Sequence, residues 1–205
     1  MPLSLEVTFT SGHVYFPAGH LSRIGGTFDG TLAASAIRDA DPAAAPPQIR
    51  TVRGETLFVS AAQRVELEQF CRASLIAVRK HPDIWGDLLM PLADTEFTPE
   101  DEEATRSRLN QAGLADGEIS QIRARVGPLM LAYNAFYWDW AHLGLADLLD
   151  ALTTTDKLPH AGLRVEEIRA ELGETAGFYA WAMKIANRTG PHSPAWDARE
   201  PPSAP

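Results

Sequence analysis

One stretch of the chain, Leu129 to Leu152, reads LMLAYNAFYWDWAHLGLADLLDAL and carries large apolar and aromatic residues at helical spacing for about six turns. On a helical wheel the apolar residues fall into two neighbouring stripes, Leu129, Tyr133, Phe136, Trp140 and Leu143 in one, and Met130, Trp138, Ala141, Leu145, Leu148 and Leu152 in the other. A narrow polar strip holds Asp139, His142 and Asp150. The pattern predicts one central helix, covered by other elements over more than half of its circumference.

The N-terminal residues instead alternate between apolar and polar side chains, which is typical of β-strands. Residues 3–9 and 13–16 flank Ser11-Gly12, and residues 49–52 and 55–59 flank Arg53-Gly54, so we expect two hairpins. The two hairpins could pair into one small antiparallel sheet. Between them we expect a weak helix over residues 32–40 and a stiff, proline-rich linker over residues 40–47.

From Ser60 onward the hydrophobic period changes from two to 3.6 residues, which predicts helices. Ser60 and Gln63 fit a capping box before the first helix, and Thr98-Pro99 fits the start of a later helix that should stop near Gly113. Further helices are expected at residues 82–90, 116–126, 163–172 and 174–187, with a break at Gly127-Pro128.

These patterns predict an α+β fold: a small N-terminal antiparallel β-hairpin region, followed by a mostly α-helical bundle around the central apolar helix. The expected divisions are a β-hairpin region packed on the body at residues 1–59, a helical domain at 60–190 and an extended tail at 191–205. The tail contains five prolines and no helical or strand period.

Composition and charge narrow the class of protein. The chain is 45% hydrophobic and 22% charged, as in an ordinary globular protein, and has one cysteine and no stretch typical of a signal peptide or a membrane span. We therefore expect a cytoplasmic protein.

Most of the formal charge of −9 comes from the second half of the chain, because residues 93–205 hold 18 acidic and 10 basic residues. This balance disfavours nucleic acid as a partner, and the preference for Arg over Lys suggests a bacterial or phage origin.

The candidate catalytic pair is Asp139 and His142, one turn apart on the polar strip of the predicted helix. Such a spacing is more often an exposed ion pair, and the histidines show no metal-binding motif such as HExxH. We therefore expect no metal, no cofactor and no catalytic role for this pair. Cys71 lies on an apolar helix face and is expected in the core, and Asp29-Gly30 is expected to form a turn.

Candidate binding residues are aromatic or acidic. They are Trp138 and Trp140 in the central stretch, Trp196 among the prolines of the tail, and Glu100, Asp101, Glu102 and Glu103 in an acidic run. Trp85, Trp138, Trp140 and Trp181 fit a core better than a ligand box, and the acidic run fits a solvated helix start. The tail is expected to dock through Trp196, on this chain or on a partner.

Two functions stay open. The first is a non-enzymatic accessory or interaction protein that binds another protein or itself, as immunity proteins, antitoxins, assembly factors and phage structural subunits do. The alternative is an enzyme or small-ligand-binding protein. Its pocket would lie beside the central helix, with Asp139 and His142 as polar groups and Tyr133, Tyr137 or Trp140 as walls.

Overall fold

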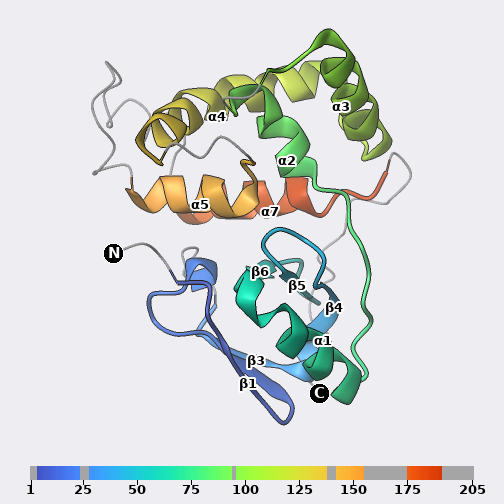
Figure 1. Cartoon of the computed structure of the whole chain (residues 1–205), viewed down its shortest axis with the longest axis vertical. Helices are drawn as coiled ribbons and strands as arrows, with labels where there is room; N and C mark the ends of the chain where they lie inside the picture. Colours follow the sequence, from blue (N-terminus) through green and yellow to red (C-terminus); the bar gives the residue numbers. More distant parts are fainter. Residues whose placement is uncertain (1–3, 24–27, 94–95, 138–141, 155–174, 191–205) are drawn as a thin grey trace, which may run out of the picture.

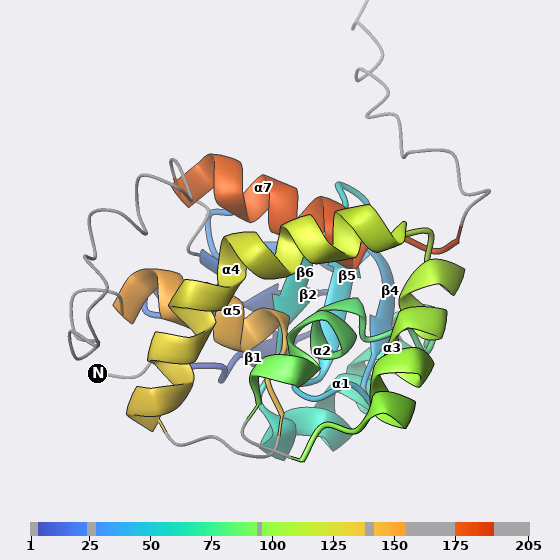
Figure 2. The same cartoon turned by 90° about the horizontal axis from the view of Figure 1, so that it is seen from above.

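The computed structural model describes residues 4–23, 28–93, 96–137, 142–154 and 175–190. Within these ranges the fold is α+β, with two three-stranded antiparallel sheets and six α-helices. The sheets and the first α-helix form one layer, and the other helices form a second layer over them (Figures 1 and 2). The predicted fold class is confirmed at this level.

The first sheet has the order β1-β2-β3, with β1 at Thr8–Thr10, β2 at His13–Tyr15 and β3 at Thr31–Ala33. Phe9 pairs with Val14, and Val14 in turn pairs with Leu32. The tight turn between β1 and β2 needs a positive φ, which Gly12 supplies at +89°. The first predicted hairpin is confirmed in part, because its turn and second strand lie as predicted but its first strand covers residues 8–10 and not 3–9.

The second sheet has the order β4-β5-β6, with β4 at Ile37–Asp41, β5 at Gln48–Thr51 and β6 at Thr56–Phe58. Ile49 of β5 lies between Ala40 and Leu57, and all three side chains are buried. Gly54, at φ +83°, forms the turn before β6. The second predicted hairpin is therefore confirmed.

Three expectations for this region are wrong. The two hairpins do not share a sheet, because each takes its third strand from residues 31–41. Residues 32–40 form no α-helix but β3, a 3-10 turn at Ala34–Ala36 and most of β4, since burying Ile37 and Ala40 outweighs the helix propensity of alanine. Ala40 and Asp41 belong to β4, so residues 40–47 are not a linker but a strand end and the turn into β5.

Side chains from elsewhere cap the β6 edge of the second sheet. The Phe58 N–H donates to the Ser22 hydroxyl at 2.9 Å, and the Thr56 N–H donates to the Met183 sulfur at 3.3 Å. Both amides are buried and face away from β5. The strand edge is thus satisfied without a fourth strand.

Helix α1, Arg64–Ala73, follows a 3-10 turn at Ala61–Gln63 that Ser60 caps. Gln63 does not close the predicted capping box. Its side chain pairs instead with both backbone groups of Val7, at 2.9 Å to the N–H and 2.8 Å to the carbonyl. Leu67, Phe70 and Cys71 of α1 are buried in the hydrophobic cluster of the sheets. The division between residues 1–59 and 60–190 stays a prediction, and this packing groups α1 with the sheets.

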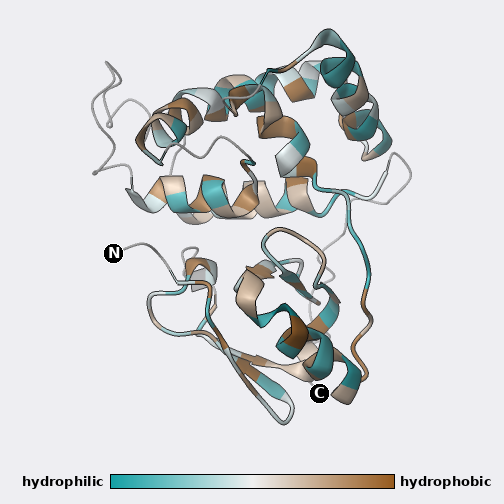
Figure 3. Cartoon of the chain, in the orientation of Figure 1, coloured by the Kyte–Doolittle hydropathy of each residue, from teal (hydrophilic) through white to brown (hydrophobic). Residues whose placement is uncertain are grey.

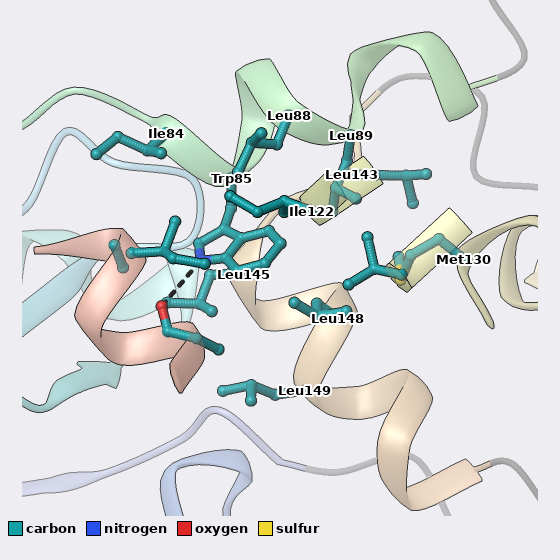
Figure 4. Close-up of a cluster of buried hydrophobic side chains, with 14 of the residues drawn as sticks. Ile84, Trp85, Leu88, Leu89, Ile122, Met130, Leu143, Leu145, Leu148 and Leu149 are labelled. Carbon is teal, nitrogen blue, oxygen red and sulfur yellow. Dashed lines mark hydrogen bonds between the residues drawn. The ribbon is translucent and has the colours of Figure 1, made fainter. Parts of the chain in front are cut away.

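The second layer contains α2 (Ile84–Leu89), α3 (Pro99–Gln111), α4 (Asp116–Tyr137), α5 (Leu145–Thr154) and α7 (Thr175–Ala186). Trp85 of α2 lies at its centre, 1% exposed and surrounded by leucines (Figure 4), with its indole N–H donating to the Ala182 carbonyl of α7 at 3.0 Å. No helix in the described ranges has both the length and the apolar character needed to cross a lipid bilayer.

The helix ends follow local capping chemistry. Thr98 and Asp101 form a full capping box at the start of α3, and Gly113, at φ +90°, follows its end as predicted. Helix α2 begins two residues later than expected, because the Asp83 side chain accepts from the Gly86 N–H and serves as its N-cap.

The predicted central helix at residues 129–152 is confirmed only in part: residues 129–137 belong to α4, residues 145–152 belong to α5, and residues 142–144 are not helical. Helix α4 runs unbroken through Gly127 and Pro128 to Tyr137, and α5 begins only at Leu145. The Gly144 N–H donates to the Asp147 carboxylate at 2.8 Å, and the Gly144 carbonyl accepts from the Leu148 N–H at 3.1 Å, so the chain starts a new helix there. Two helices can bury the same apolar residues, and α4 and α5 pack against each other.

Asn187, just after α7, joins the two layers. Its amide N–H groups donate to the Gly54 carbonyl at 2.7 Å and to the Met183 carbonyl at 2.8 Å. Its carbonyl oxygen accepts from Arg50 of β5 at 3.4 Å. One side chain thereby fixes the end of α7 against the β5–β6 turn.

Candidate functional site

The segment after α1 extends the second sheet by a short parallel pairing with β4. The Ala40 N–H donates to the Ala77 carbonyl at 3.0 Å, and the Arg79 N–H donates to the Ala40 carbonyl at 2.9 Å. Because backbone groups alternate along an extended chain, the N–H and carbonyl of Val78 face away from the sheet. Within the described part of the chain they have no hydrogen-bond partner. We call residues 76–80 the edge segment.

A buried ionic cluster fixes the end of the edge segment to β4. His81 Nε2 lies 2.7 Å from Asp39 Oδ1, and the His81 backbone N–H donates to the Asp41 carboxylate at 2.9 Å. Asp39 and Asp41 are 2% and 3% exposed. Burial opposes the ionisation of Asp39, but hydrogen bonds from His81 and Arg38 overcome it and lower the pKa of Asp39 to about 2. The segment is therefore held by the ionised side chain of Asp39 and by the side chain of Asp41, as well as by its backbone.

Arg50 lies beside this cluster, opposite Asp39 in the β4–β5 register. Its side chain is buried, and its Nε has no hydrogen-bond partner in the described structure. Burial and the nearby Arg38 lower the pKa of Arg50 to about 10, against the opposing effect of Asp39 and Asp41. This cluster was not predicted from the sequence. Asp39 and Asp41 alternate as residues of a strand do, but residues 32–40 were expected to form a helix.

A groove of about 330 Å³ runs beside the edge segment. Its walls are Asp41, Pro42 and Ala43 after β4, Glu68 and Arg72 of α1, and Ile76, Val78 and Lys80 of the edge segment. The last three residues alternate along the segment and so project from one face of it. The groove thus combines an apolar floor with charged side chains at its rim.

Apolar side chains are exposed along this groove. Leu75 is 93% exposed and Val78 is 58% exposed. The first half of the connection between α1 and α2 is accordingly coloured hydrophobic in Figure 3. Leu75 has φ +56°, and the Ile76 N–H donates to the Cys71 carbonyl at 2.9 Å, as in a Schellman cap. This position usually holds glycine, and leucine there costs about 1 kcal/mol. At 93% exposure, the Leu75 side chain buries little apolar surface to offset this cost.

The acidic run is used mainly within the chain. Asp101 closes the capping box of α3, and hydrogen bonds from Thr98 lower its pKa. Glu102 binds Arg123 at 3.0 Å and Arg106 at 3.3 Å, and Glu103 lies 3.6 Å from Arg106. Glu100 is exposed in the first turn of α3. These contacts fit the interpretation as a helix start, and a docking role for these residues stays a prediction.

The predicted pair of Asp139 and His142 is described only in part, because Asp139 lies outside the described residues. His142 lies in a non-helical segment before α5, and its Nε2 is 3.1 Å from Asp83 Oδ2, with both side chains about half exposed. Asp139, Trp138, Trp140 and Trp196 lie outside the described residues. Among the described residues, no group of three or more His, Cys, Asp or Glu side chains could hold a metal ion.

Other predicted core residues lie as expected. Cys71 is buried, and desolvation together with Glu68 raises its pKa to about 11, which makes the thiol a poor nucleophile. The rings of Trp85 and Trp181 meet edge to face at 5.7 Å. Tyr133 packs in the core and donates to the Asp150 carboxylate at 3.0 Å.

A second hollow, of about 440 Å³, lies beside the first sheet between residues 4–8, 15–17 and 29–31 and the side chain of Gln63. The Thr31 N–H donates to the Asp29 carboxylate there at 2.9 Å, which confirms the predicted turn. Like the groove beside α1, this hollow is not lined by α4, where the alternative function places its pocket.

Comparison of the chain with known protein families, with curated proteins and with solved structures finds no match. The site therefore rests on its own geometry.

Proposed function

We propose that this protein is a non-enzymatic accessory or interaction protein that binds another protein, of the immunity or antitoxin, assembly-factor or phage structural-subunit type. The observation that carries the proposal is Leu75, a leucine held fully exposed in a backbone conformation that disfavours it, beside an apolar groove. Single exposed apolar residues are common on proteins. An exposed pair that flanks a groove and a fixed sheet edge is typical of a binding surface.

The chemistry around this surface supports binding rather than catalysis. The acidic side chains nearest to it, Asp39 and Asp41, are buried and engaged with His81. The charged residues at the rim of the groove, Glu68, Arg72 and Lys80, are suited to orienting a partner. The further contact regions that we propose, Trp138, Trp140, Trp196 and residues 100–103, belong to the acidic second half of the chain.

Native mass spectrometry of the full chain, purified gently from its source organism, tests the proposal. We expect one protein partner at fixed stoichiometry. The complex should persist with Leu131→Gln, which removes an exposed apolar side chain from α4, and should weaken at least tenfold with Leu75→Asn. Asparagine tolerates a positive φ, so the second variant should fold normally.

A chain that is recovered alone, or with a retained small molecule, would overturn this function. The second result would favour the alternative of an enzyme or ligand-binding protein with Asp139 and His142 at its pocket. A protein partner that binds the Leu75→Asn variant with unchanged affinity would support the function and place the binding surface elsewhere.

A further inference from the structure

The edge segment offers a partner more than an apolar surface. The outward N–H and carbonyl of Val78 are an unused donor and acceptor at the edge of a sheet, which is what an added β-strand requires. The edge is also prepared for this role, because Ala40, Asp39 and Asp41 already hold the segment in extended form. Because the edge segment is already ordered, pairing with an added strand would cost this chain little conformational entropy.

The groove adds a place for side chains. A strand paired to Val78 would direct alternate side chains toward the face that Ile76, Val78 and Lys80 share, where the groove opens. Leu75 lies at one end of the segment and is exposed to contact them. An apolar residue in the added strand would bury against Leu75 and Val78.

The charge around the edge segment indicates the charge of the partner. Arg72, Arg79 and Lys80 are exposed here, and Glu68 is the acidic side chain exposed at the groove. Asp41 is buried and accepts from two backbone N–H groups, those of Ala43 and His81. The local charge is thus positive on a chain of net charge −9, and it complements an acidic segment.

We propose that the edge segment binds an extended, acidic segment of a partner protein as an additional β-strand, with an apolar side chain of that segment against Leu75 and Val78. This proposal rests on the protein-binding function above and adds the mode of binding and the chemistry of the partner. Pairing between two copies of this chain is disfavoured, because both edges would carry the same local positive charge. Lysine at a sheet edge can also serve to prevent aggregation. The exposed apolar side chains of Leu75 and Val78 at the same edge do not fit that role.

Selection of a random dodecamer peptide library, displayed on phage, against the immobilised full chain tests the proposal. Enriched peptides should alternate apolar residues with Asp or Glu. The affinity of a synthetic enriched peptide, measured by fluorescence anisotropy, should fall as salt rises. A matched peptide with Asn and Gln in place of Asp and Glu should bind at least tenfold more weakly.

Variants of the full chain distinguish strand addition from nonspecific hydrophobic binding. Val78→Pro removes the outward N–H but no hydrogen bond within the described chain, so it should abolish peptide binding while thermal unfolding stays near that of the wild type. Leu75→Asn should weaken binding at least tenfold, and Leu131→Gln should leave it unchanged. As a readout independent of affinity, the exchange of the Val78 amide hydrogen should slow when the peptide is bound.

Several outcomes would overturn the proposal. They are a selection without enriched peptides, an enriched set that is neutral or basic, or peptide binding that Val78→Pro leaves intact. A concentration-dependent dimer that Val78→Pro abolishes would instead assign the edge to a second copy. If native mass spectrometry shows a partner that binds Val78→Pro normally, the proposed function stands and strand addition fails. If no partner exists, both fail.

Discussion

The two layers of this molecule bury different kinds of side chain. The helical layer encloses leucines, Met130 and Trp85, whereas the sheet layer encloses Asp39, Asp41 and Arg50 at 2–3% exposure. A helix satisfies its backbone internally, but a short sheet leaves two unpaired edges. Polar side chains form hydrogen bonds at those edges in the small sheets here. The Gln63 side chain binds the backbone of Val7, and the His81 ring binds the Asp39 carboxylate. Among the described residues, the buried Asp and Arg side chains therefore all belong to β4 and β5.

The largest expected effect tests the helical layer. Trp85→Ala should destabilise the protein by about 3–5 kcal/mol, because it leaves a cavity among leucines and removes the hydrogen bond to Ala182. Urea unfolding followed by circular dichroism measures it. Leu67→Ala in the sheet cluster is the matched change and should cost about 2–5 kcal/mol. Two separate unfolding transitions in either variant would show that the layers do not unfold as one unit.

The next effect tests the sheet layer through its response to acid. The pKa of Asp39 is lowered in the folded state, so its stabilisation is fully present above its unfolded pKa of 3.8 and is lost as pH falls toward 2. The loss should be about 2 kcal/mol. Asp39→Asn should be less stable at pH 6 and should show a flatter decline in melting temperature between pH 4 and 2. An unchanged slope would mean that other carboxylates cause the acid sensitivity.

The smallest effect tests the joint between the layers. Asn187→Ala removes the donors to the carbonyls of Gly54 and Met183 and the acceptor for Arg50, and should cost about 1–2 kcal/mol. Hydrogen exchange should then accelerate in the β5–β6 turn and at the end of α7, but not in α3. Uniform acceleration throughout the chain would instead indicate a loss of global stability alone.

Local patterns predicted the elements whose causes are local. Both hairpins followed from alternation and the Gly12 and Gly54 turns, and the limits of α3 followed from Thr98-Pro99 and Gly113. The helix at 129–152 was confirmed only in part because an apolar pattern does not say where one helix ends and the next begins. Capping at Gly144 decided that, through the carboxylate of Asp147.

The candidate site could not be predicted in the same way, because its residues meet only in three dimensions. Asp39, Arg50 and His81 come from β4, β5 and the end of the edge segment, and no sequence motif links them. Leu75 continues the apolar helical spacing of Leu67, Phe70 and Cys71 in the sequence, but α1 ends before it. Four of the predicted site residues, Asp139, Trp138, Trp140 and Trp196, lie outside the described residues, and their roles stay predictions.

The capped β6 edge also limits where a further strand can be added to the second sheet. A sheet that is open on both sides can accept a strand on each, so its copies or partners can add without limit and form a ribbon. Here Ser22 and Met183 occupy the amides of Phe58 and Thr56, so a strand could add beside Val78 but not beside β6. Copies of this chain therefore cannot join through both edges of the second sheet to form a ribbon.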